Sequence, residues 1–69
     1  MSTSYLQSCI SRASKYPEDQ LRDAQMSFLS DIRKHESLKT ISENPLTFAI
    51  ITTTKTKFEL IEAMKSLNI

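Results

Sequence analysis

The chain has 69 residues, with nine Lys and Arg against eight Asp and Glu, one Cys and no Gly. By the usual scaling laws such a chain folds to roughly 4,400 Å² of surface, which corresponds to one small domain over residues 1–69. The lack of Gly excludes Gly-rich phosphate-binding loops and disfavours an all-β meander, whose tight turns need residues at positive φ. We therefore expect a mostly helical chain.

The charge balance and the short apolar runs disfavour nucleic acids and membranes as partners. A formal net charge of +1 is too small for a strongly electrostatic nucleic-acid binder, which presents a basic patch on a basic domain. The longest apolar run, residues 48–51, is far shorter than the ~18 residues of a membrane span, and no secretory signal is visible. A single Cys is typical of a reducing compartment. We expect a cytoplasmic protein without membrane association.

Two amphipathic helices are predicted in the first half of the chain. The first covers about residues 3–15 and ends before Pro17, because the residue preceding a proline disfavours the helical conformation. Pro17 is then expected to be the first residue of a second helix that extends to residue 34 or 35, with an acidic first turn and a basic last turn. The predicted buried residues are Tyr5, Leu6, Cys9, Ile10 and Ala13 in the first helix and Leu21, Ala24, Phe28, Leu29 and Ile32 in the second.

The next part of the chain is harder to predict. One helical turn is expected within residues 36–43. For residues 46–54, five consecutive β-branched residues favour a strand, whereas the Asn44-Pro45 start and the helical spacing of Leu46, Ala49 and Ile50 favour a helix. Because a lone strand would leave its backbone groups unpaired, we expect a helix, and an α+β fold with one strand at 46–54 is the alternative.

A last helix is predicted over about residues 57–67. Thr56-x-x-Glu59 has the pattern of a capping box, and Leu60, Ile61 and Met64 follow at helical spacing. The predicted fold is therefore an all-α bundle of three or four short helices. A chain this small without disulfides needs unusually good packing or a partner, so we also expect it to form a homodimer.

The sequence offers little reactive chemistry. Zinc needs about four convergent ligands, but Cys9 and His35 are the only soft or imidazole ligands, so we expect no metal and no cofactor. Cys9 falls among apolar residues and is interpreted as a buried thiol, and His35 as a solvent-side or capping residue. The carboxylate pairs Glu18/Asp19 and Glu59/Glu62 are interpreted as solvated. We therefore expect neither an enzyme nor a small-molecule substrate.

Residues 52–57 carry hydroxyls and two lysines next to a helix N-terminus. They are interpreted as a solvated turn, with contact to a phosphate or an acidic side chain as the alternative. A helix-turn-helix that binds DNA is a second alternative, with residues 57–67 as the recognition helix and Lys55, Lys57 and Lys65 on phosphates. Glu59 and Glu62 on the exposed face of that helix disfavour DNA binding.

Some apolar residues fall outside the predicted buried stripes of their helices. If residues 46–54 are helical, Phe48 and Ile51 lie off the stripe of Leu46 and Ile50, and Met26 lies off the stripe of its own helix. Such residues either form a surface patch for a partner or are enclosed by the surrounding helices.

We expect a protein–protein interaction or regulatory module that binds a protein partner or a second copy of itself. Phe48, Ile51 and Phe58 are predicted at the contact, and Lys55 and Lys57 at its rim. Besides a DNA-binding regulator, the alternative is an inhibitor or adaptor of a host protein, encoded by a virus or mobile element.

Overall fold

The computed structural model describes residues 2–67, and within them the chain forms five α-helices, two short 3₁₀ turns and no strand. The predicted all-α class is confirmed, although the helices number five rather than three or four. The elements are α1 (Ser2–Ser14), a 3₁₀ turn (Glu18–Gln20), α2 (Leu21–Lys34), a 3₁₀ turn (Glu36–Leu38), α3 (Lys39–Ser42), α4 (Pro45–Thr52) and α5 (Lys57–Ser66).

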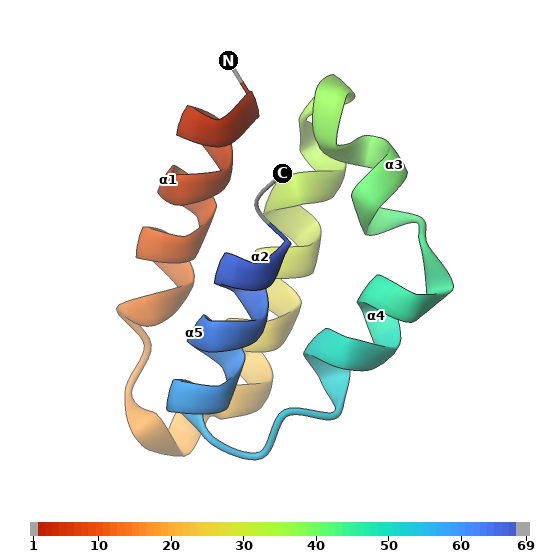
Figure 1. Ribbon diagram of the computed structural model, residues 1–69. Helices are drawn as coiled ribbons and strands as arrows, with labels where there is room; N and C mark the ends of the chain where they lie inside the picture. Colours follow the sequence, from red (N-terminus) through yellow and green to blue (C-terminus); the bar gives the residue numbers. More distant parts are fainter. Residues whose placement is uncertain (1, 68–69) are drawn as a thin grey trace.

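The three longest helices form the body of the molecule. α1 and α2 run in opposite directions, and α5 packs against α1 on one side and α4 on the other (Figure 1). α3 and α4 follow one another along the edge of α2 on the side away from α1 (Figure 1). The accessible surface is 4496 Å², which agrees with the area expected for a compact chain of this length.

One hydrophobic core joins the helices. Phe28 of α2 is its largest fully buried side chain, with no exposed surface. The predicted stripes of α1 and α2 are confirmed as core-facing, with Tyr5, Ile10 and Leu21 only half-buried at its margin. The buried apolar residues are Leu6, Cys9, Ala13, Ala24, Phe28, Leu29, Ile32, Leu38, Ile51, Leu60 and Met64.

The start of α2 differs from the prediction. Pro17 has ψ 159°, which is extended, and it precedes a 3₁₀ turn in which the Gln20 N–H donates to the Pro17 carbonyl at 2.9 Å. The α-helix begins only at Leu21, because Gln20 has φ −116° and ψ 41°, outside the helical region. This extra turn lets the chain reverse direction between α1 and α2.

Residues 45–52 are helical, so the strand alternative is wrong. The Asn44 side chain accepts a hydrogen bond from the Leu46 N–H at 2.8 Å, and Pro45 occupies the first turn. At the other end, the hydroxyls of Thr52 and Thr53 donate to carbonyls four residues earlier, at 2.8 and 2.7 Å. Only three of the five β-branched residues belong to the helix, so their strand preference is outweighed by the capping.

The capping box of α5 is formed in a modified way. The Thr56 hydroxyl accepts from the Glu59 N–H at 3.0 Å, as the pattern predicts. The Glu59 carboxylate, however, accepts from the Lys55 N–H at 2.8 Å, one residue earlier than in the usual motif. Both contacts hold the turn between α4 and α5 in place.

Buried polar side chains connect the helices. The Gln25 amide of α2 donates to the carbonyls of Ile51 and Thr54 at 3.0 and 3.2 Å, and to the Thr54 hydroxyl at 2.8 Å. The Lys57 ammonium donates to the carbonyls of Ser14, at 2.8 Å, and Tyr16. Gln25 therefore fixes the end of α4 on α2, and Lys57 fixes the start of α5 on the end of α1.

Candidate protein interface

α4 is apolar on every side but is buried on only one. Its eight residues include no charged side chain. A helix of this composition is normally enclosed by other elements. Here only Thr47 and Ile51 are buried, whereas Leu46 is 67% exposed and Phe48 is 50% exposed. α4 thus exposes apolar surface that residues 2–67 do not cover.

The orientation of α4 differs from the predicted one. The expected stripe of Leu46 and Ile50 is not the buried one: Leu46 is exposed and Ile50 is half-buried. The hydrogen bonds from Gln25 to the Ile51 and Thr54 carbonyls draw the opposite side of the helix towards α2. Because α4 is apolar all round, its spacing alone gives no preferred side, and Leu46 was therefore missed as a candidate contact residue.

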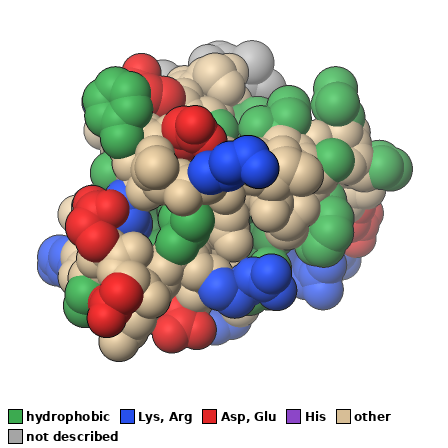
Figure 2. Space-filling model, turned by 90° about the horizontal axis from the view of Figure 1, so that it is seen from below, with side chains coloured by type: hydrophobic (Ala, Val, Ile, Leu, Met, Phe, Trp, Pro, Cys, Tyr) green, Lys and Arg blue, Asp and Glu red, His purple; other side chains and the backbone are tan. Residues whose placement is uncertain are grey.

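A shallow groove of about 340 Å³ runs beside this helix. Its lining combines apolar side chains with an arginine and two hydroxyls: Met26, Leu29, Ser30 and Arg33 from α2, Ser42 from α3 and Phe48 from α4. Met26 is 40% exposed, so of the two placements that the sequence left open for it, the surface one is found. In Figure 2, hydrophobic side chains gather on the right-hand side of the face shown, the side on which α4 lies in Figure 1.

The predicted contact residues fall into two groups. Phe48 and Phe58 are exposed, Phe58 at 73%, and Lys55 is exposed in the turn before α5. Ile51, with no exposed surface, and Lys57, with 6%, are buried, so their predicted placement on a contact surface is wrong. Ile51 fills the core below α4, and Lys57 is withdrawn because its ammonium binds the carbonyls at the end of α1.

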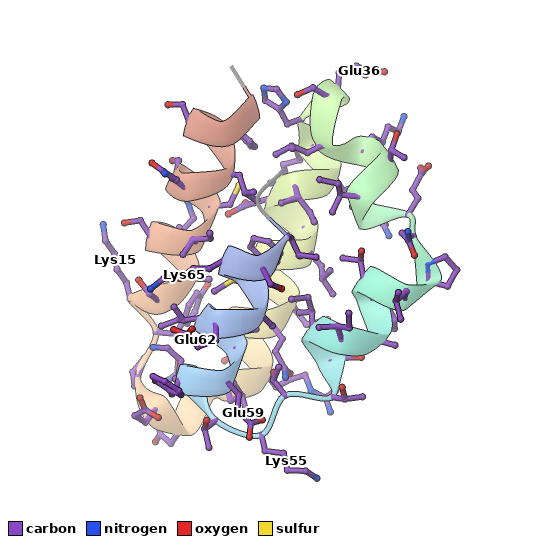
Figure 3. The ribbon with its side chains drawn as sticks, viewed as in Figure 1. Lys15, Glu36, Lys55, Glu59, Glu62 and Lys65 are labelled. Carbon is purple, nitrogen blue, oxygen red and sulfur yellow. The ribbon has the colours of Figure 1, made fainter. Side chains whose placement is uncertain are left out.

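The exposed residues do not form one patch. Phe48 lines the groove beside α4, but Phe58, in the first turn of α5, is not part of that lining. Figure 3 shows the Lys55 side chain extending away from the helices, with Glu59 close to its turn. We call the α4 face the exposed groove residues Met26, Arg33 and Phe48 together with Leu46 and Ala49 on the exposed side of α4.

The turn at residues 52–57 offers little to an anion. The Glu59 carboxylate already occupies the position beside the Lys55 N–H, and Lys57 points into the protein. The exposed side of α5 carries Glu59, Glu62 and Lys65, with the last two 3.8 Å apart as an ion pair. Because Lys57 is buried, only two of the three lysines expected to contact DNA phosphates, Lys55 and Lys65, are exposed.

A larger hollow of about 430 Å³ lies between α1 and α5. It is lined by Leu6, Gln7, Ile10 and Lys65, but Leu6 is buried and Ile10 is half-buried. This hollow therefore has no strongly exposed apolar side chain, in contrast to the α4 face.

Cys9 and His35 are not brought together as a reactive pair. Cys9 is 3% exposed in the core, while His35 lies at the end of α2, with its ring stacked on Tyr5 at a centroid distance of 4.2 Å. The His35 Nδ1 is 2.8 Å from the Ser37 hydroxyl. Burial raises the pKa of the Cys9 thiol, and the nearby Asp31 carboxylate adds to this effect. No group of three His, Cys, Asp or Glu residues that could hold a metal occurs among the residues described.

The raised pKa of Cys9 predicts a loss of stability at alkaline pH. Above pH 9.0, the ordinary pKa of the thiol, the unfolded chain releases the proton while the folded chain keeps it, so the free energy of unfolding falls as the pH rises. Tyr5, whose pKa is also raised by desolvation, extends this fall above pH 10.0. Urea unfolding between pH 8 and 10.5 should show a shallower decline for Cys9→Ala than for the wild type. Equal slopes would contradict the expectation.

None of the helices within the described part of the chain has the length and apolar character needed to cross a membrane. Comparisons of the chain with models of protein families, with curated proteins and with solved structures find no match.

Proposed function

We propose that this protein is an interaction module without catalytic activity, and that it binds an apolar helix of another polypeptide through the α4 face. The observation that carries the proposal is the exposure of Leu46 and Phe48 on a helix without charged side chains. The two side chains lie on opposite flanks of the exposed side of α4, and exposed apolar surface of this kind is typical of protein contact sites. The residues that we expect at the contact are Phe48 at the centre and Lys55 at the rim, together with Leu46, whose exposure supports its inclusion.

The shape of the α4 face favours a helix as the bound element. A helix that lies along the exposed side of α4, at the edge of the groove between α2 and α4, would place a stripe of apolar side chains against Leu46, Phe48 and Ala49. Arg33, at the margin of the groove, would favour an acidic residue at the edge of that stripe. Phe58 lies outside the groove and is proposed only as a secondary contact.

Site-specific photo-crosslinking in the native host tests this proposal. A photoreactive amino acid at position 48 is expected to give a covalent adduct with a polypeptide, because Phe48 would lie against the partner. The same group at Ser8, on the exposed side of α1, is the matched control and should give little adduct. Leu46→Asp in the crosslinking chain should remove the adduct, since a carboxylate would be buried at the contact.

Two results would contradict the proposal. One is the absence of any polypeptide adduct from position 48. The other is an adduct that forms equally from positions 48 and 8 and persists in Leu46→Asp, because contact would then not depend on the α4 face.

A further inference from the structure

We infer that the helix bound by the α4 face is α4 of a second copy of this chain, in an antiparallel, two-fold symmetric pair. This inference rests on the proposed function and names its partner. It combines two observations: the small residues on the outermost side of α4, and the opposite charges that flank the helix at equal distances in the sequence.

The outermost side of α4 is suited to close helix packing. Pro45, Ala49 and Thr53 follow at a spacing of four residues, all are exposed, and they lie opposite the buried Thr47 and Ile51. Because Ala49 is small, a second helix can approach it closely, at the lower end of the 8–10 Å range of interaxial distances. Leu46 and Phe48 lie on either side of this line and would cover the flanks of the partner helix.

The charges beside α4 favour the antiparallel direction. Glu43 precedes the helix and Lys55 follows it; both are exposed, and all residues between them are uncharged. Ala49 is midway between the two charged residues in the sequence. A two-fold axis at Ala49 therefore brings Glu43 of one copy towards Lys55 of the other, and the symmetry produces two such pairs. A parallel pair would instead bring like charges together.

Neither of these charged side chains forms an ion pair inside the described part of the chain. In Figure 3 the Lys55 side chain points away from the helices. Both charges are thus available to a second copy. An eight-residue helix is about 12 Å long, so the contact belongs to the small interfaces, below about 1,200 Å² in total, and we expect a weak dimer in reversible exchange.

Sedimentation equilibrium of the purified chain, from micromolar to millimolar concentration, tests the inference. The wild type is expected to shift from monomer to dimer over this range. Ala49→Lys places two ammonium groups at the symmetry axis and should weaken dimerisation by about 100-fold or more, since like charges at an interface cost several kcal/mol. Ser8→Lys, an exposed change of the same charge on α1, is the control and should leave the association constant unchanged.

Charge reversal tests the antiparallel direction. Glu43→Lys and Lys55→Glu should each weaken the dimer by about tenfold, because symmetry changes two pairs at once. The double variant, which restores opposite charges across the pair, should recover the wild-type affinity within about twofold. If α4 packed in parallel, each of these residues would face its own copy, so neither single reversal would weaken the dimer; the same result is expected if another surface carries the contact.

The outcomes separate this inference from the proposed function. A chain that stays monomeric to millimolar concentration, that dimerises equally well as Ala49→Lys, or that is not restored by the double charge reversal overturns the α4 pairing. If position 48 nevertheless crosslinks specifically to a different protein, the α4 face still binds a polypeptide and only the identity of the partner is wrong.

Discussion

Lys57→Met is expected to lower the free energy of unfolding by about 2–4 kcal/mol, a large effect for a lysine. The residue is 6% exposed, and its ammonium donates to the carbonyls of Ser14 and Tyr16 at the end of α1. Methionine keeps the apolar stem but leaves these carbonyls without their charged donor, which also interacts favourably with the C-terminal end of the helix dipole. Urea unfolding followed by circular dichroism measures the change.

Lys55→Met is the matched control, because it removes the same charge two residues earlier from an exposed side chain. It should alter stability by less than about 0.5 kcal/mol. Similar values for the two variants would contradict the assignment of Lys57 as the link between α1 and α5. A stabilisation by Lys57→Met would do so as well, since it would mean that burial of the ammonium costs more than its hydrogen bonds return.

Phe28→Ala is expected to lose about 3–5 kcal/mol, because it removes the aromatic ring of the largest fully buried side chain in the core and leaves a cavity. A 69-residue domain has roughly 3–10 kcal/mol of total stability at the usual value per residue. The variant should therefore be partly or largely unfolded at 25 °C, with a reduced helical circular dichroism signal and a broadened thermal transition.

Phe58→Ala tests the same substitution at a position that is 73% exposed. Its expected effect is below about 0.5 kcal/mol, since little apolar area is withdrawn from water there. A loss at Phe58 as large as that at Phe28 would mean that α5 packs differently from the structure described.

Local signals in the sequence located most of the helices. Asn44-Pro45 and Thr56-x-x-Glu59 act within four residues of a helix start, and the structure forms hydrogen bonds at both sites. The amphipathic stripe of α1 likewise indicated its buried side. Such features depend on residues that are neighbours in the sequence, so no knowledge of the tertiary fold is needed to interpret them.

The candidate interface could be predicted only in part. Phe48 and Ile51 were both expected at the contact because they lie off the stripe of Leu46 and Ile50; Phe48 is exposed, but Ile51 is buried, because a helix that is apolar on all sides has no preferred face. Its orientation depends on Gln25, 26 residues away in sequence. The burial of Lys57 depends on carbonyls more than 40 residues away, at Ser14 and Tyr16. Neither contact is visible in local spacing.

The most direct measurement of contact at the α4 face is the concentration dependence of backbone amide chemical shifts. On dilution of the labelled protein from the millimolar to the micromolar range, the amides of residues 46–53 and of Met26 should shift, while those of Ser8 and Ser11 on the far side of α1 stay constant. Shifts that concentrate on α1, or spectra of α4 that do not change over the whole range, would contradict pairing through this helix.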